Sequence, residues 1–177
     1  MQKSLAAEVK QKIRSIPDFP KKGILFRDIT PLLVDEKKFR LCIDHFAALT
    51  RERIDCVISI ESRGFILGSA LAYALNAGFV PIRKEGKLPH ATLRSSYKLE
   101  YGRAVVEIHT DAVARGARVV LIDDVLATGG TMKAAVGLAE KLGAKILGVY
   151  FLIELKTLGG RNRLEGLPVH SLVSYGP

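Results

Sequence analysis

The most informative stretch of the sequence is Val119-Val120-Leu121-Ile122-Asp123-Asp124-Val125-Leu126-Ala127-Thr128-Gly129-Gly130-Thr131. An apolar run of strand length ends in two acids, and a loop of small residues leads into a helix that we expect to open at Thr131. The start of a helix presents unpaired N–H groups and the positive end of the helix dipole. Gly129 and Gly130 let the backbone approach an anion closely, and Thr128 and Thr131 add hydroxyl donors. The stretch therefore predicts a binding site for a phosphate group.

The two acids at the end of this strand, Asp123 and Asp124, would repel a phosphate. They suit such a site if they face sugar hydroxyls, a bound Mg²⁺ or a developing positive charge. A pair of solvated turn residues is the alternative interpretation. The loop is not a Walker A motif, because no Lys-Ser or Lys-Thr pair follows its glycines, and it does not match GxGxxG. The segment as a whole predicts a pocket that binds a phosphate together with the sugar attached to it.

The rest of the chain repeats the pattern of apolar strand, loop and helix. Apolar stretches predict strands at 56–60, 79–82, 118–122 and 146–153, and we expect a last, short strand at 169–173. Apolar residues at helical spacing predict helices at 5–16, after Asp35, at 65–75 and at 131–142. Between these elements we expect a loop at 89–96 and a hairpin of 97–100 with 104–109. Continuous apolar strands that alternate with helices are typical of a parallel sheet covered on both faces. We therefore expect an α/β, Rossmann-like fold whose ligands bind at the carboxyl ends of the strands.

The composition is that of a single globular domain. Of the 177 residues 48% are apolar, so the chain can bury a core without disulfides or metals. Cys42 and Cys56 lie in apolar stretches and are expected to be buried and unpaired, and no Cys/His cluster has the spacing of a zinc site. The N-terminus lacks the features of a secretory signal, and no apolar run has the length of a membrane span. We therefore expect a cytoplasmic protein with no membrane partner.

The net charge of +9 suits either nucleic acid or a polyanionic small molecule as the partner. The cations are spread over loops that follow apolar segments, without a basic run or tail, which favours the small molecule. Arg63, in Glu61-Ser62-Arg63-Gly64, stands at the start of a predicted helix, where it opposes the dipole unless it binds an anion bidentately. Lys84 and Lys87 flank Gly86 in a later loop, which we expect to be a mobile, basic lid. A plain solvated loop is the alternative for Lys87.

The stretch 119–131 resembles the motif by which type I phosphoribosyltransferases bind 5-phosphoribosyl 1-pyrophosphate (PRPP): a hydrophobic strand, two acids and a short loop rich in Thr and Gly. The resemblance implies the fold of that family, with residues 1–177 forming one domain and about 84–103 forming a flexible hood. It also implies that Asp123 and Asp124 contact the ribose hydroxyls. By resemblance, the 5-phosphate is held by Ala127, Thr128, Gly129, Gly130 and Thr131, and the pyrophosphate by Ser62, Arg63, Lys84 and Lys87.

The N-terminal segment, residues 1–34, resembles the members of this family that act on adenine, chiefly in Ile16–Pro20 and Gly23–Leu33. By resemblance, Phe26 lies on one face of the adenine ring and Leu155 on the other, where stacking on an aromatic ring gives roughly 1–3 kcal/mol. Leu25 and Arg27 would present backbone groups to the edge of the base. Ordinary core packing is the alternative for Phe26 and Leu155. Two further residues, Glu100 and Tyr101, would exchange the proton of the base and cover the site, unless they are a surface hairpin pair.

The activity that the resemblance implies is purine salvage, in which adenine and PRPP give AMP and pyrophosphate. Mg²⁺ would be the cofactor, held mainly by PRPP and through water by Asp123 or Asp124. The catalytic residues would be Asp123, Asp124, Arg63 and Glu100. Members of the family commonly form dimers, so we expect a homodimer without a nucleic-acid partner. Two alternatives stay open: a phosphoribosyltransferase for another base, and a non-catalytic PRPP-binding regulator of nucleic acid.

Overall fold

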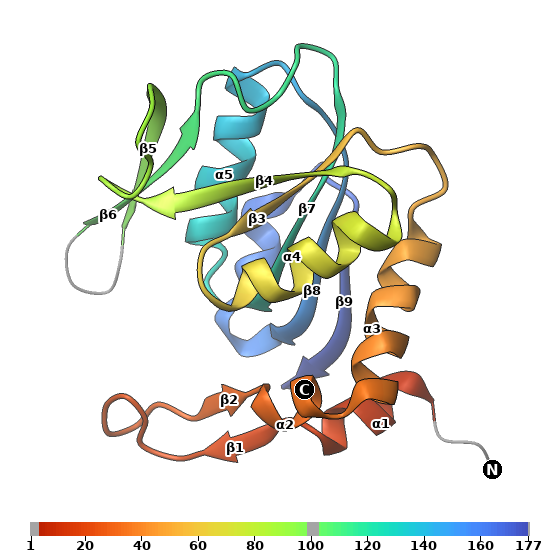
Figure 1. The fold of residues 1–177 in the computed structure, drawn as a ribbon. Coiled ribbons are helices and arrows are strands. Elements are labelled where there is room, and N and C mark those ends of the chain that lie inside the picture. The colour runs from red at the N-terminus through yellow and green to blue at the C-terminus, as the bar shows by residue number, and fades with distance from the viewer. Residues whose placement is uncertain (1–3, 99–102, 177) are drawn as a thin grey trace.

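The computed structural model describes residues 4–98 and 103–176 of the chain. A seven-stranded sheet forms its centre, in the order β5-β6-β4-β3-β7-β8-β9 (Figure 1). The parallel strands are β4 (Gly78–Lys84), β3 (Cys56–Ile60), β7 (Arg118–Leu126), β8 (Lys145–Leu155) and β9 (Val169–Tyr175). The hairpin of β5 (Thr92–Lys98) and β6 (Arg103–His109) continues the sheet beyond β4 with antiparallel pairing. The predicted α/β, Rossmann-like fold is therefore confirmed.

Helices cover both faces of the parallel sheet (Figure 1). One face carries α1 (Leu5–Gln11), α2 (Thr30–Val34), α3 (Glu36–Leu49) and α4 (Arg63–Ala74), and the other carries α5 (Gly130–Lys141). Successive strand residues point to opposite faces, so Ile58 packs in the core beside α5 while Val57 packs in the core beside α3 and α4. The whole of β3 is buried, which explains the continuous apolar sequence that predicted it. Cys42 and Cys56 are buried and free, as predicted.

The N-terminal part adds a small hairpin of its own. Strands β1 (Arg14–Ile16) and β2 (Phe26–Asp28) pair only with each other and form a separate two-stranded sheet. In Figure 1 this hairpin lies beneath the carboxyl ends of the central strands. At the other end of the chain, β8 runs into two short 3₁₀ turns, η1 (Lys156–Leu158) and η2 (Gly160–Leu164). Both segments therefore reach the edge of the sheet at which we expect ligands.

Two local predictions are wrong. The loop expected at 89–96 becomes strand from Thr92, because the edge of the sheet offers β6 as a partner, with Leu93 opposite Ile108. The polar residues of this stretch give no continuous apolar run, so the sequence pattern does not show the strand. The helix expected at 5–16 ends at Gln11, because Arg14–Ile16 pairs with β2 instead. The predicted hairpin of 97–100 with 104–109 is present as β5 and β6, although 99–102 lie outside the described residues.

The parallel pairing brings the predicted site loops to one edge. Strand β3 pairs with β4 on one side and β7 on the other, and β8 lies beyond β7. The residues that follow β3, β4 and β7 thus come from neighbouring strands, although they are far apart in the sequence. The expectation that ligands bind at the carboxyl ends of these strands rests on this geometry.

Candidate active site

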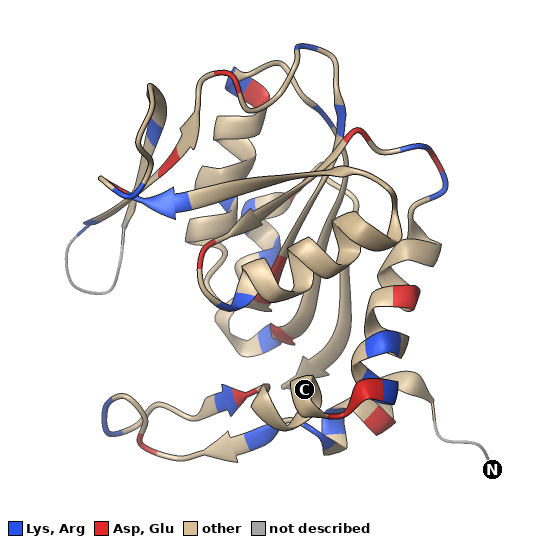
Figure 2. Cartoon of the chain, in the orientation of Figure 1, with Lys and Arg blue, Asp and Glu red and all other residues tan. Residues whose placement is uncertain are grey.

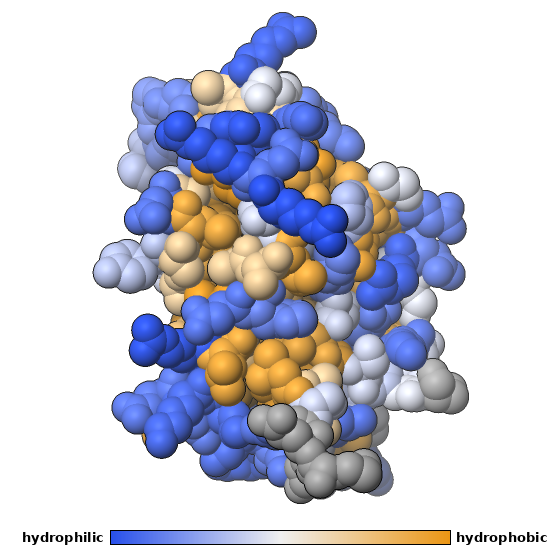
Figure 3. Space-filling model, turned by 90° about the vertical axis from the view of Figure 1, so that its right-hand side faces the viewer, coloured by the Kyte–Doolittle hydropathy of each residue, from blue (hydrophilic) through white to orange (hydrophobic). Residues whose placement is uncertain are grey.

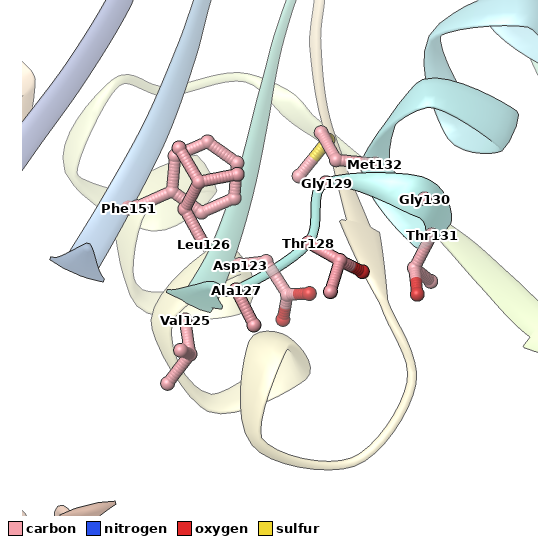
Figure 4. A pocket seen from close by; sticks show the side chains of 10 residues that line it. All are labelled: Asp123, Val125, Leu126, Ala127, Thr128, Gly129, Gly130, Thr131, Met132 and Phe151. Atoms are coloured by element: carbon pink, nitrogen blue, oxygen red, sulfur yellow. The ribbon is translucent and has the colours of Figure 1, made fainter. Parts of the chain in front are cut away.

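The loop between β7 and α5 forms a small pocket. Its volume is about 70 Å³, the size of a small anion rather than of a nucleotide, and it is lined by Asp123, Val125, Leu126, Ala127, Thr128, Gly129, Gly130, Thr131, Met132 and Phe151 (Figure 4). Figure 4 shows the Asp123 carboxylate and the hydroxyls of Thr128 and Thr131 along one side of the loop. The helix begins at Gly130, one residue before the predicted start, so its first N–H groups face this loop. The structure thus brings together all five residues predicted to hold a phosphate.

Two glycines from distant parts of the chain fix the shape of this loop. Gly129 has a φ of +76°, and a Cβ there would lie 2.4 Å from the carbonyl oxygen of Gly160. In the reverse direction, a Cβ on Gly160 would lie 2.2 Å from the carbonyl oxygen of Ala127. The 127–131 loop and η2 therefore touch backbone to backbone. The sequence reasoning missed Gly160, for which the only signal is the adjacent pair Gly159-Gly160.

The two acids are packed beneath the start of α4. Asp124 is almost fully buried, with 6% of its surface exposed. The backbone N–H of Asp124 donates to Oδ1 of Asp123 over 2.9 Å. A Cβ on Gly64 would lie 2.6 Å from that same Oδ1, so only glycine fits there. Burial raises the pKa of the Asp123 carboxyl well above its ordinary value, and the Asp124 charge raises it further. Burial also raises the pKa of Asp124, although the Arg63 guanidinium acts in the opposite direction.

Arg63, the first residue of α4, bridges the acids and the N-terminal hairpin. Its Nε lies 2.7 Å from Oδ2 of Asp124, and its guanidinium lies 4.8 Å from the centroid of the Phe26 ring. Within the described residues, Nη1 of Arg63 is a buried atom without a hydrogen-bond partner, and Oδ2 of Asp124 is in ion-pair contact with Arg63 but does not have the geometry of a hydrogen bond. The residue before it, Ser62, has a φ of 76°, which is strained for a side chain other than glycine and turns the chain sharply from β3 into α4. The pair therefore keeps unused polar capacity that a ligand could satisfy.

A set of cations gathers at the end of β4, held by the acid Glu61. Oε2 of Glu61 lies 3.4 Å from Nε of Arg83 and accepts from the N–H of Lys84 over 3.0 Å, while Oε1 lies 3.8 Å from Nζ of Lys84. Nη1 of Arg83 donates to the carbonyl of Lys87 over 3.1 Å. Figure 2 shows blue at the tip of β4 and charges of both signs at the ends of the central strands. The sequence reasoning gave Glu61 and Arg83 no role of their own.

A second acid, Glu107 of β6, ties the segment that follows these cations to the sheet. Its carboxylate is buried and accepts from the N–H of Gly86 over 2.9 Å and from the hydroxyl of Thr92 over 3.3 Å. Nε of Arg94 lies 2.8 Å from Oε1 of Glu107 and forms an ion pair with it. One buried carboxylate thus holds the turn after β4 and two positions of β5. The part of the predicted hood that the structure describes is therefore attached to β6 by charge and hydrogen bonds.

The residues predicted to bind the base lie on the N-terminal hairpin and at the end of β8. The Phe26 ring is half-buried and meets that of Phe19 edge-on, with centroids 5.0 Å apart, while Leu25 is about half exposed. The guanidinium of Arg27 lies 3.7 Å from the centroid of the Tyr175 ring. Leu155 is the last residue of β8 and pairs in register with Tyr175. Glu100 and Tyr101 lie outside the described residues, so the structure does not place them.

The fold and this site define a member of a known class: the chain belongs to the phosphoribosyl transferase domain family, whose model matches residues 14–167. A curated relative from Jannaschia sp. (strain CCS1), named adenine phosphoribosyltransferase, is 54% identical over 94% of this chain and 95% of its own length. The crystal structure of adenine phosphoribosyltransferase from Thermoanaerobacter pseudethanolicus is 50% identical, has a TM-score of 0.93, and matches over 97% of this chain and 100% of the other. The family resemblance inferred from the sequence is therefore confirmed.

A third neighbour carries ligands. The structure of adenine phosphoribosyltransferase from Saccharomyces cerevisiae, complexed with D-2,5-dideoxy-2,5-imino-altritol 1,6-bisphosphate and adenine, is 41% identical. It has a TM-score of 0.90 and matches over 95% of this chain and 98% of its own.

Among the residues that the structure describes here, no helix is both long enough and apolar enough to span a membrane.

Proposed function

We propose that this chain transfers the phosphoribosyl group of PRPP to adenine and so produces AMP and pyrophosphate. The observation that carries the proposal is the junction of β3 and β7, where Arg63 contacts both Asp124 and the Phe26 ring beside the 127–131 loop. The 127–131 loop, two acids, a cation and an aromatic ring thus meet at one edge of the sheet, which supports binding of a phosphate, a sugar, a pyrophosphate and a base side by side. Relatives about half identical over nearly the whole chain bear the name adenine phosphoribosyltransferase.

The proposed mechanism assigns one part of PRPP to each part of the site. The 127–131 loop binds the 5-phosphate through its backbone N–H groups and hydroxyls. Asp123 and Asp124 accept hydrogen bonds from the ribose hydroxyls and stabilise positive charge on the ribose ring in the transition state. Ser62, Arg63, Lys84 and Lys87 hold the pyrophosphate, and Arg63 shifts toward it from Asp124. Holding the sugar and the leaving group in this way fixes the anomeric carbon for attack.

The base binds between the N-terminal segment 1–34 and the end of β8. Phe26 and Leu155 lie against the two faces of adenine, and the backbone of Leu25 and Arg27 reads its edge. N9 of adenine attacks the anomeric carbon, while the bond to pyrophosphate breaks and its electron pair leaves with the pyrophosphate oxygen. The proton of N9 passes to Glu100, and Tyr101 covers the site. Closure of the hood, about 84–103, excludes water that would otherwise hydrolyse PRPP.

The acids also suit a divalent cation. Oδ2 of Asp124 is a buried carboxylate oxygen that forms an ion pair with Arg63, and carboxylate oxygens are the ligands that Mg²⁺ prefers. The described residues contain no cluster of three or more side chains that could hold a metal by themselves. We therefore propose that Mg²⁺ is held mainly by PRPP, with Asp123 or Asp124 contacting it through water. When bound, the ion neutralises charge on the pyrophosphate.

A panel of bases tests the proposal. PRPP and Mg²⁺ are offered with adenine, hypoxanthine, guanine or orotate, and nucleotide formation is followed by chromatography. We expect AMP from adenine, because a site that accepts a hydrogen bond from the 6-amino group rejects bases without a 6-amino group by roughly 10⁴-fold. A parallel reaction in excess EDTA should form no AMP. Preference for another base would assign the chain to that base, and tight nucleic-acid binding at physiological salt without turnover would favour the regulator.

Replacing Arg63 by alanine should weaken the binding of PRPP and pyrophosphate. Because charge-assisted hydrogen bonds contribute roughly 1.5–3 kcal/mol each, we expect dissociation constants about 10-fold to 100-fold higher, measured by calorimetry. The matched control is Arg118→Ala, since Arg118 forms an ion pair with Asp55 at the opposite ends of the same two strands. The control should bind both ligands as the unmodified chain does. Equal affinities in all three proteins would remove Arg63 from the pyrophosphate site.

We also propose that the chain acts as a homodimer in the cytoplasm. Figure 3 looks onto the side where α3 lies and shows hydrophobic patches between hydrophilic residues. Val34 and Tyr73 are more than four-fifths exposed, and Tyr73 borders a groove between α3 and α4 with Phe39 and Ile43. Such surface favours association with a second copy. A monomer in sedimentation at micromolar concentration would contradict the dimer, and recovery in the membrane fraction of cells would contradict the compartment.

A further inference from the structure

The N-terminal hairpin depends on side chains for its position. Its two strands share no ladder hydrogen bonds with the seven-stranded sheet. Apolar anchors lie at its ends, where Ile13 and Ile29 enter the core that faces α3 and α4. Phe26, which is proposed to stack on adenine, lies between these anchors. Something must therefore hold the middle of β2 at a fixed distance from the main sheet.

The contact at this point is between Arg27 and Tyr175. Adjacent residues of a strand point to opposite sides, so the Arg27 side chain faces away from the side on which Phe26 meets Arg63. Its guanidinium lies 3.7 Å from the centroid of the Tyr175 ring, within the range of a strong cation–π contact. Nη1 of Arg27 also donates to the hydroxyl of Ser15, directly across the hairpin. One guanidinium thus links both strands of the hairpin to one aromatic ring.

The same ring is fixed to the other side of the proposed base site. Tyr175 ends β9, where it pairs in register with Leu155, so the two side chains lie on the same face of the sheet. Helix α1 secures this end of β9, because Nζ of Lys10 donates to the carbonyl of Ser174 over 3.2 Å and lies 4.6 Å from the Tyr175 centroid. The Tyr175 ring therefore stands between the strand that carries Phe26 and the strand that carries Leu155.

We propose that Tyr175 is a positioning residue for adenine, which sets the spacing between Phe26 and Leu155 through its contact with Arg27 and its pairing with β8. This inference rests on the proposed function and adds a residue that the resemblance did not assign. Tyr175 touches neither PRPP nor adenine. Its loss should therefore affect the base site alone and leave the phosphate, ribose and pyrophosphate sites unchanged.

The test compares Michaelis constants for the two substrates in matched variants. Since a cation–π contact of this kind changes an equilibrium by roughly 3-fold to 30-fold, Tyr175→Leu should raise KM for adenine by about that factor. Its KM for PRPP and its kcat should stay within about twofold of the unmodified chain. Tyr175→Phe keeps the ring and should restore adenine KM. Arg118→Met, at the amino end of β7, is the control for removing a side chain away from the site and should leave both Michaelis constants unchanged.

Arg27→Met removes the guanidinium and keeps the backbone that is proposed to read the base. It should reproduce the effect of Tyr175→Leu, and the double variant should be no worse than either single variant. If Tyr175→Leu does not fold, the two Michaelis constants are compared between Arg27→Met and the unmodified chain instead. An unchanged adenine KM in these variants, an equal rise in KM for PRPP, or multiplied effects in the double variant would overturn the inference. An unmodified chain that makes no AMP would instead overturn the proposed function, and the inference with it.

Discussion

Replacing Gly129 by alanine is expected to lower kcat/KM for PRPP by about 100-fold or more. The new Cβ would lie 2.4 Å from the carbonyl oxygen of Gly160, and ordinary contact begins at 3.4 Å, so the loop must move by about an ångström. A displacement of that size at a binding group can reduce rates roughly 100-fold. The φ of +76° adds strain of about 1–2 kcal/mol for any residue with a Cβ. Steady-state kinetics with PRPP as the varied substrate measure the effect.

Two further variants show whether the shape of the loop is the cause. Gly160→Ala approaches the same contact from the other side and should reproduce the loss, although Gly160 is far from Gly129 in the sequence. Gly137→Ala is the matched control, because Gly137 lies within α5, the helix that Gly129 caps, and a Cβ there meets none of the described residues within 4 Å. It should keep full activity and gain about 0.4–1 kcal/mol of stability. Full activity in Gly129→Ala would show that the loop does not hold the 5-phosphate.

Replacing Asp124 by asparagine should lower kcat by roughly 10²-fold to 10³-fold, the range seen when one group that stabilises transition-state charge is lost. The substitution keeps the shape of the side chain and removes its negative charge. Stability should not fall with activity. Burial raises the pKa of this carboxyl in the folded chain. The carboxyl therefore adds to the free energy of unfolding only below its ordinary pKa, and this contribution is lost as pH rises through the raised pKa. At neutral pH the asparagine should therefore leave the melting temperature unchanged or higher.

The matched control for this variant is Asp55→Asn. Asp55 also pairs with an arginine, Arg118, but at the amino ends of β3 and β7. Hydrogen bonds to Arg118 lower the pKa of Asp55, so the charged form stabilises the folded chain and its loss should reduce the melting temperature. Its kcat should stay the same. The two variants thus separate chemistry from folding, and a kcat near that of the unmodified chain for Asp124→Asn would remove its proposed role.

The elements and residues that the sequence predicted are those with a local signal. The strand 118–122, the two acids and the glycine loop are contiguous, and a buried parallel strand needs an apolar run whatever lies beside it. The order of strand, loop and helix then places Arg63 at the same edge as Asp124, as the ion pair between them shows. The family and the fold could therefore be inferred before any coordinates.

What the sequence did not show depends on contacts between distant residues. Gly160 matters because it meets Ala127 across the fold, and Glu61 because Arg83 comes from the neighbouring strand. Tyr175 in turn matters because Arg27 lies above it. None of these partners is near in the chain, and a single glycine or glutamate has many ordinary uses. The strand from Thr92 was missed for the same reason, since its partner β6 determines it more than its own residues do.

The buried Glu107 carboxylate has a consequence for each round of turnover. It fixes Gly86, Thr92 and Arg94, while Glu61 fixes Arg83 and the backbone of Lys84. Under the proposed function, the backbone of the turn at the start of the hood, which carries Lys84 and Lys87 toward the departing pyrophosphate, is held in place by the folded chain. Ordering the backbone of one residue costs roughly 1–2 kcal/mol. For this turn the cost arises once, when the chain folds, so pyrophosphate can bind and leave without the turn being ordered again in each cycle.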